Sequence, residues 1–193
     1  MSKEKKKNSI LLASLEIFTK QGFYKTTISQ IAKHIGISVG NVYNYFPSKE
    51  SLAKASIVFV TEKLATILHN INAQDIPAKE KVACFVEEYL EFLQKHPEMI
   101  EYFFRIYLAN REVFYQSDDS GFSLAESFIK ELEKLVTDGI ASKEFANQDF
   151  YISFACISGI LGGITFLHGE KVLQADLAQY KKNLAHAICK SLS

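Results

Sequence analysis

Very few residues in this chain can interrupt a helix. Its 193 residues include three prolines and nine glycines, the two residue types that most often end helices and strands. In the stretches between these prolines and glycines, apolar residues recur three and four positions apart, as in Ile10, Ala13 and Ile17. This is the spacing of one helix face. Apolar residues make up 48% of the chain, enough for a packed core. The sequence therefore predicts an all-α protein with about nine helices.

Residues that start and stop helices set the expected boundaries. Thr27, with Gln30 three residues later, forms a capping-box pattern. Gly36 is suited to ending the helix that follows, and Ser38 and Ser48 are typical N-caps of two further helices. Later breaks are expected at Pro97, at residues 117–121, at Gly139 and at Gly169. The predicted helices cover residues 9–21, 27–35, 39–45, 48–72, 78–95, 98–115, 121–138, 147–168 and 173–191.

The helices predicted over 27–35 and 39–45 are short and are joined by a turn of about three residues. Ala32 is small and lies in the first of them, and Val42 lies where the second would face it. This is the pattern of a helix-turn-helix, in which the second helix enters the major groove of DNA. Residues 1–54 hold nine lysines and three glutamates, although the net charge of the whole chain is zero. A basic end on a neutral protein favours a polyanionic partner at that end.

Residues 10–52 resemble the DNA-binding domain of the TetR family of bacterial transcriptional regulators. The pieces that carry the resemblance are Ala13 to Phe18, Gly22-Phe23, Thr26-Thr27, Ile31-Ala32, Gly36, Ser38, Gly40, Tyr43, Tyr45-Phe46 and Ser48-Lys49-Glu50. The resemblance implies a helix-turn-helix DNA-binding domain in residues 1–50 and a helical ligand-binding and dimerisation domain in residues 51–193. It also implies a set of DNA contacts, which are Thr27, Ser38, Val39, Gly40, Asn41, Tyr43, Asn44, Tyr45 and Lys49.

The chemistry of the third predicted helix suits this role. Asn41 and Asn44 can offer an amide to a base edge, with adenine as the natural bidentate partner, and Val39 can touch a thymine methyl. The resemblance implies that Tyr43 and Tyr45 meet phosphate and sugar. Tyr45 is an equally good core residue, because it falls on the inner face of the helix.

Other residues of the first domain are expected to position the protein on the phosphate backbone. Gly40 lets the start of the helix approach DNA closely. Thr27 and Ser38 precede backbone N–H groups that can bind phosphates, and the resemblance implies a further phosphate contact from Lys49. The lysine-rich stretch at residues 3–7 is expected to be a flexible arm that adds salt-sensitive contacts. Most such contacts position a protein without specifying sequence.

An effector site is implied for the second domain, whose middle helices are rich in aromatic residues. Pockets for small molecules are largely apolar with a few polar groups. The residues expected to line it are Phe59, Phe85, Tyr89, Phe92, Phe103, Tyr107, Arg111, Phe128 and Phe154. The alternative for each aromatic is a place in the core. A pocket of this kind favours a small apolar or aromatic effector.

Dimerisation is expected along a stripe of small residues. Ala155, Gly159 and Gly163 recur every four residues, so that another helix can approach closely. Packing within the chain is the alternative. Residues 150–167 hold no charged side chain, yet their glycines and hydroxyl residues favour a buried or interface helix over a membrane span. The expected partners are therefore a double-stranded DNA operator, a small-molecule effector and a second copy, without a membrane.

The sequence points away from catalysis. It contains no nucleophile-elbow, zinc-protease or phosphate-loop motif, and its histidines lack metal-ligand spacing. No cofactor and no metal are expected. The predicted function is a cytoplasmic, ligand-responsive repressor that leaves its operator when the effector binds. The alternative is a small-molecule-binding or thiol-sensing protein with weak or lost specific DNA binding. Val39 is uncharged, and both arginines, Arg105 and Arg111, lie outside the first domain; both observations give the alternative some weight.

Overall fold

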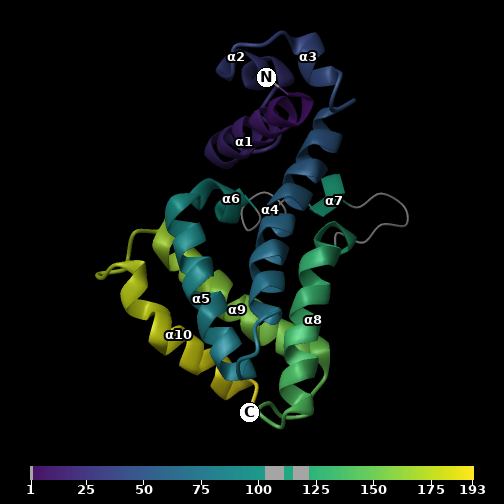
Figure 1. Ribbon diagram of the computed structural model, residues 1–193. Coiled ribbons are helices and arrows are strands. Elements are labelled where there is room, and N and C mark those ends of the chain that lie inside the picture. Colours follow the sequence, from purple (N-terminus) through teal and green to yellow (C-terminus); the bar gives the residue numbers. More distant parts are fainter. Residues whose placement is uncertain (1, 103–110, 115–121) are drawn as a thin grey trace. The chain divides into compact units, whose positions relative to one another are not determined.

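The computed structural model describes residues 2–102, 111–114 and 122–193. These residues form ten α-helices and one short 3₁₀ helix without any strand, which confirms the all-α class (Figure 1). The elements are α1 Lys3–Gln21, α2 Ile28–His34, α3 Val39–Tyr43, α4 Lys49–Asn72, α5 Ala78–Lys95, α6 Pro97–Tyr102, α7 Arg111–Phe114, η2 Ser123–Ala125, α8 Glu126–Ala141, α9 Phe150–Gly169 and α10 Leu177–Ser191. Part of the helix predicted over 98–115 lies outside the described residues, and its described parts are α6 and α7.

The chain divides into two compact units. The head unit comprises Met1–Thr61 and Glu98–Ala125, and the bundle unit comprises Glu62–Pro97 and Glu126–Ser193. Helix α4 is continuous, so its first half belongs to the head unit and its second half to the bundle unit. The division between a DNA-binding and a ligand-binding domain at residue 50 is a division of function, and it stays a prediction.

Helix α1 supplies much of the core of the head unit. Ile10, Leu15 and Phe18 are fully buried, and the Phe18 ring packs 5.8 Å from that of Tyr102 on α6. The helix begins at Lys3, six residues before the predicted start, because the Ser2 hydroxyl accepts a hydrogen bond from the Lys5 N–H at 3.3 Å. The prediction of a flexible lysine arm is therefore wrong, since these lysines belong to the first turns of α1.

The helix-turn-helix is held by its own caps. Thr27 and Gln30 form the predicted capping box: the Gln30 N–H donates to Thr27 Oγ1 at 3.3 Å and the Thr27 N–H to Gln30 Oε1 at 2.8 Å. Gly36 has φ +68°, a left-handed conformation that favours glycine, and it lets the chain turn toward α3. Ser38 caps α3, which ends two residues before the predicted boundary.

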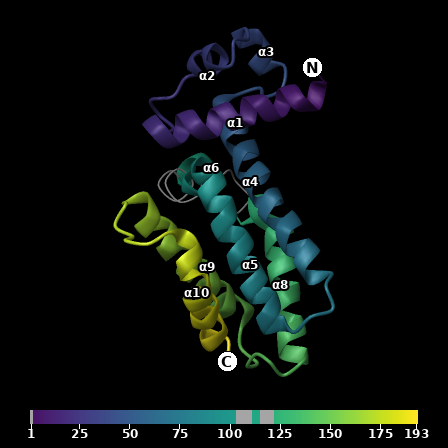
Figure 2. The ribbon, with the colours of Figure 1, turned by 60° about the vertical axis from the view of Figure 1, so that its left-hand side comes forward.

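The bundle unit packs α5 closely against α10 and also contains α8 and α9 (Figure 2). The Tyr89 hydroxyl on α5 shares a buried hydrogen bond of 2.6 Å with Thr165 Oγ1 on α9. The first N–H groups of α5 are satisfied by a carboxylate from the turn after α8: Glu144 accepts from Ala78 N at 2.9 Å and from Lys79 N at 3.0 Å. Pro77, at the N-cap position itself, makes no side-chain cap.

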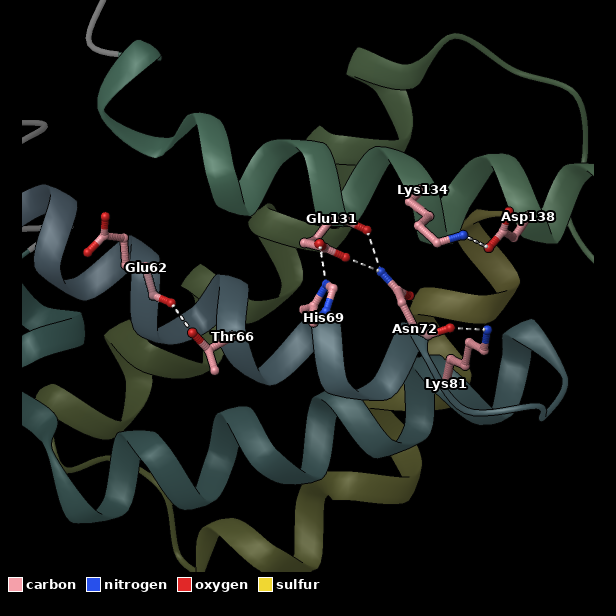
Figure 3. Close-up of polar contacts among 8 residues, drawn as sticks. All are labelled: Glu62, Thr66, His69, Asn72, Lys81, Glu131, Lys134 and Asp138. Atoms are coloured by element: carbon pink, nitrogen blue, oxygen red, sulfur yellow. Dashed lines mark hydrogen bonds and ion pairs between the residues drawn. The ribbon is translucent and has the colours of Figure 1, made fainter.

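The C-terminal end of α4 is tied to α8 and α5 by polar groups (Figure 3). The Asn72 amide nitrogen donates to the Glu131 carbonyl and to its carboxylate, each at 2.9 Å. His69 Nδ1 lies 2.8 Å from the same carboxylate, and the buried Lys81 ammonium donates to the Asn72 carbonyl at 3.0 Å. Neighbouring helices therefore help to satisfy the end of α4, together with the local backbone bonds from Ala73 N–H to the His69 carbonyl and from Gln74 N–H to the Ile71 carbonyl.

Gly139 does not break a helix, and that expectation was wrong. It lies inside α8, near the C-terminal end of the helix. Its carbonyl accepts the N–H groups of both Glu144 and Phe145, which folds the Phe145 ring onto the glycine. A Cβ at residue 139 would stand 2.1 Å from that ring. The glycine therefore makes room for a side chain instead of ending the helix.

Candidate nucleic-acid interface

The outward face of α3 is formed by four predicted DNA contacts. Side chains advance about 100° per residue around a helix, so Val39, Tyr43, Gly40 and Asn44 fall within one arc of about 140° and Val42 lies outside it. Burial agrees with this geometry: Val42 is fully buried, whereas Val39 is 39% and Tyr43 49% exposed. Gly40 and Asn44 are exposed as well. The fold therefore presents these four of the nine residues that sequence reasoning assigned to DNA on one exposed surface of α3.

The polar side chains of this face are not used for folding. Within the described ranges, the side chains of Asn41, Tyr43 and Asn44 make no hydrogen bond and no ion pair. Asn41 is half-buried at the flank of the face, and Asn44 is the exposed C-cap residue of α3. Exposed amides without an intramolecular partner can exchange water for the hydrogen-bonding edge of a ligand at little cost.

Tyr45 has features of both roles considered for it, a DNA contact and a core residue. It is half-buried, and its ring centroid is 6.5 Å from that of the buried Phe46. Thr27 and Ser38 are exposed, but both hydroxyls accept hydrogen bonds from the N–H groups of their own helices. DNA contacts from these three residues stay a prediction.

Lys49 has a structural role that sequence reasoning missed. Its ammonium donates to the carbonyls of Phe23 at 3.0 Å and Thr26 at 3.1 Å, and it lies 4.3 Å from the centroid of the Phe23 ring. An ammonium has three donors, so these two bonds leave one for a phosphate. Lys49 thus ties the start of α4 to the connection between α1 and α2, next to the helix-turn-helix.

The residues predicted for the effector fall into separate groups. In the bundle unit, Phe85 packs against Tyr89 and Phe128 with ring centroids 6.3 and 6.0 Å apart. The Phe92 ring is tilted against that of His96 with centroids 5.5 Å apart, and the Phe154 ring against that of Phe150 with centroids 6.2 Å apart. Phe59 is half-buried on the head-unit part of α4. Phe103 and Tyr107 lie outside the described residues, as does the side chain of Arg111.

Tyr89 is a core residue rather than a free polar group. Its hydroxyl bonds to Thr165 and its side chain is 4% exposed. Burial raises the pKa of this phenol well above its usual value, more than the hydrogen bond from Thr165 lowers it. A surface pocket of about 260 Å³ lies where α9 turns into α10, lined by Gln94, His168, Lys171, Leu173, Ala175, Asp176 and Leu177. Of the residues expected above to line the effector pocket, those that the structure describes, Phe59, Phe85, Tyr89, Phe92, Phe128 and Phe154, do not line it.

Helix α9 carries an exposed apolar face that contains the stripe of small residues. Ala155, Gly159 and Gly163 are exposed, and no described atom lies within 4 Å of a Cβ placed on either glycine. Tyr151 and Phe166, near the two ends of the helix, are 64% and 65% exposed. By length and composition alone α9 could also cross a membrane, although one helix of this kind is a weak indication. Sequence reasoning located the small residues, and the large apolar residues beside them extend the face.

The three cysteines are reduced and half-buried. Burial raises the pKa of the Cys84 and Cys189 thiols, which disfavours the reactive thiolate. No group of three metal-ligating side chains occurs among the described residues.

Comparison with known proteins extends these observations. Residues 10–56 match the family model of bacterial regulatory proteins of the tetR family. The HTH-type transcriptional regulator LuxR of Vibrio harveyi is 24% identical over 139 residues, which cover 69% of this chain and 68% of LuxR. The fatty acid metabolism regulator protein of Bacillus subtilis is 26% identical over 147 residues, covering 74% and 72%.

Solved structures share the fold over nearly the whole chain. The fatty acid degradation regulator FadR from Bacillus halodurans superposes with a TM-score of 0.83 at 17% identity, covering 98% of this chain and 97% of that one. FadR from Bacillus subtilis in complex with stearoyl-CoA gives a TM-score of 0.76 at 18% identity, covering 96% and 98%. At such identities the superpositions establish the fold.

Proposed function

Because this chain belongs to the TetR family of bacterial transcriptional regulators, we propose that it represses transcription by binding an operator and that a small apolar effector releases it. The observation that carries the proposal is the α3 surface. Val39, Gly40, Tyr43 and Asn44 lie together on the exposed side of a short, capped helix. Their polar groups are left for a ligand, and an α-helix of this kind fits the major groove.

The operator-binding form is a dimer. A helix-turn-helix reads two half-sites about one DNA turn apart when two copies are related by a two-fold axis. The exposed apolar face of α9 supports a second copy as its occupant, since a two-fold interface needs one self-complementary patch. The glycines at 159 and 163 have open space above them, which is where a partner helix can approach closely.

The effector is a long-chain acyl group, free or as a thioester. This proposal is supported by the curated fatty acid metabolism regulator and by the FadR structure that holds stearoyl-CoA. Within the chain, the half-buried Phe128 beside the buried Phe85 offers apolar surface of the kind such a ligand requires. Effector and operator bind antagonistically, and each weakens the other by the same factor.

Fluorescence anisotropy tests the DNA-binding part. A labelled duplex from just upstream of the protein's own gene is titrated against a scrambled duplex at one fixed physiological salt concentration. We expect binding to the real sequence to be at least about a hundredfold tighter, because specific regulators discriminate by roughly three decades or more. Equal, weak and salt-sensitive binding to both duplexes would contradict the proposal and favour a binding protein without an operator.

Effector release is measured on the same complex. Stearoyl-CoA, stearic acid, coenzyme A alone and a set of aromatic carboxylic acids are added in turn. We expect stearoyl-CoA, stearic acid or both to lower the anisotropy by releasing the DNA, and coenzyme A alone to have no effect. Release by aromatic acids only would replace the acyl proposal with an aromatic effector and leave the regulator itself in place.

The dimer has a matched pair of variants. Gly159→Glu places a charge on the exposed face of α9, where one chain alone accommodates it. Ala83→Glu places the same charge on an exposed position of α5. Light scattering after gel filtration should show a monomer for the first and a dimer for the second. A dimeric Gly159→Glu protein would exclude this face as the interface.

The thiol-sensing alternative has a direct test. If a thiol controlled DNA binding, hydrogen peroxide would change the operator affinity and Cys84→Ser or Cys156→Ser would abolish that change. We expect no response to peroxide, because burial disfavours the Cys84 thiolate.

A further inference from the structure

We propose that the operator half-site of this protein is A·T-rich where α3 meets it, with Asn44 reading an adenine and Val39 contacting a thymine methyl. The inference rests on the proposed function, since it assumes that α3 enters the major groove. The inference adds the base pairs that α3 recognises in the groove. Three observations carry it: the absence of cations from α3, the free amide of Asn44 and the exposed apolar side chain of Val39.

Cations are missing from the whole reading helix. Residues 38–45 hold no lysine, arginine or histidine, and the two arginines of the chain are Arg105 and Arg111. Guanine is read most often by a bidentate arginine or lysine on its O6 and N7 atoms. The lysine that follows α3 in the chain is Lys49, and two of its three donors are engaged by backbone carbonyls of the head unit. The head therefore lacks the usual means of selecting a G·C pair from α3.

Asn44 has the donor and acceptor that adenine requires. A carboxamide can donate to adenine N7 and accept from its N6 amino group at the same time. Asn44 is exposed, shares the outward face with Val39 and Tyr43, and its side chain makes no hydrogen bond to any described side chain or backbone group. Asn41 has the same amide but is half-buried at the flank of this face, so Asn44 is the better placed of the two.

Val39 complements this preference. It is the first residue of α3 and is 39% exposed, although apolar. The C5 methyl of thymine is the apolar group that base pairs present in the major groove. A valine at this position gains by covering that methyl and loses by covering the amino group of a cytosine, which it cannot hydrogen-bond. Asn44 and Val39, the two proposed base contacts on the exposed face, therefore both favour A·T pairs.

The first experiment selects the operator from a random pool. The protein is incubated with double-stranded DNA of random sequence, bound duplexes are amplified, and the enriched sequences are read. We expect two symmetric half-sites with A·T pairs at the invariant central positions of each. Half-sites centred on invariant G·C pairs would overturn this inference and leave the proposed function standing, whereas no enriched sequence would overturn both.

The second experiment assigns the two contacts by atom. In one half-site of the selected duplex, adenine is replaced by 7-deazaadenine, which lacks only the N7 acceptor, or thymine by uracil, which lacks only the methyl. For the wild-type protein we expect the first change to weaken binding by roughly 3- to 10-fold, part of a bidentate contact. We expect the second to weaken it by about 3- to 4-fold, the effect of one buried methyl.

Protein variants test which side chain makes each of the two contacts. Asn44→Ala should become insensitive to 7-deazaadenine and keep its sensitivity to uracil, and Val39→Ala should show the reverse. Asn70→Ala removes an exposed amide from α4 in the bundle unit and should retain both sensitivities. Circular dichroism confirms that each variant is folded. The assignment is overturned if Asn44→Ala still responds to 7-deazaadenine at every adenine of the half-site as strongly as the wild type.

Discussion

The head unit and the bundle unit hold the ends of their helices in different ways. In the head unit each cap comes from within three residues: Ser2 for α1, Thr27 for α2 and Ser38 for α3. Ser48 and Ser51 likewise exchange reciprocal bonds of 3.0 Å at the start of α4. In the bundle unit α9 also has a local cap, because Asp149 accepts from the Tyr151 N–H at 2.8 Å, but two other helix ends are held by groups far away in sequence. Glu144 caps α5 from a separation of 66 residues, and Glu131 holds the end of α4 from 59 residues away.

This difference has an energetic meaning. A local cap satisfies one helix end, so its loss leaves the packing of that helix on its neighbours intact. A side chain far away in sequence satisfies polar groups at a helix end and also joins two helices. Its loss therefore leaves hydrogen-bonding groups without partners on both helices. The bundle unit should therefore respond more strongly to the removal of one polar side chain than the head unit, and the following predictions test that ranking.

Asn72→Ala should have the largest effect. It removes both hydrogen bonds to Glu131 and leaves a part-buried carbonyl and a carboxylate with fewer donors. We expect a loss of about 2–3 kcal/mol in the free energy of unfolding, because one of the two acceptors is charged. Urea denaturation followed by circular dichroism measures it. Asn70→Ala, an exposed neighbour on α4, should change stability by less than about 0.5 kcal/mol, and equal effects of the two variants would contradict a stabilising role for the contacts between Asn72 and Glu131.

Glu144→Ala should rank second. The variant leaves the Ala78 and Lys79 N–H groups at the start of α5 without their carboxylate. Because Glu144 is partly solvated, water can replace some of what is lost, and we expect about 1–2 kcal/mol in the same measurement. Glu144→Gln retains one acceptor oxygen and should lose about half as much. A Gln variant as unstable as the Ala variant would show that charge, and not hydrogen bonding, makes the cap.

Thr27→Ala tests the local caps of the head unit. It removes the hydroxyl that accepts from the Gln30 N–H, and an N-cap deletion of this kind costs about 1 kcal/mol. Thr27→Ser keeps the hydroxyl and should be nearly as stable as the wild type. If thermal denaturation showed Thr27→Ala to be less stable than Asn72→Ala, the proposed ranking of local and distant contacts would be reversed.

Lowering the pH should reduce the stability of the bundle unit by less than the substitutions above. Backbone hydrogen bonds from Lys79 and Ala78 lower the pKa of Glu144 below its usual 4.5. Burial works to raise the pKa of Glu131, but hydrogen bonds from Asn72 and His69 outweigh it and lower that pKa as well. Carboxyls with lowered pKa values contribute stability above about pH 4.5, and this contribution is lost as the pH falls below it. Urea midpoints between about pH 6 and pH 3.5 should fall less steeply for Glu144→Gln than for the wild type, and parallel slopes would rule out this source.

The same difference decides how much the sequence alone could predict. The capping box at Thr27, the helix starts after Ser38 and Ser48, and the exposed polar face of α3 all depend on residues a few positions apart. The roles of Lys49, Glu144 and Gly139 depend on which distant backbone or ring folds against them, and no local pattern records that. Sequence reasoning missed the two structural bonds of Lys49 because its carbonyl partners lie 23 and 26 residues before it. For the effector, spacing could indicate aromatic helix faces but could not show which of them meet.

The early start of α1 changes what its lysines contribute to DNA binding. Lysines in a mobile arm lose conformational entropy when they settle on a phosphate, whereas Lys3, Lys5 and Lys7 already stand on a formed helix. They are exposed at its first turns, where the partial positive charge of the helix end adds to their own. Each of them that neutralises a phosphate releases condensed counterions and steepens the logarithmic dependence of affinity on salt by about 0.9. We therefore expect the affinity of the head unit for DNA to depend on ionic strength as well as on DNA sequence.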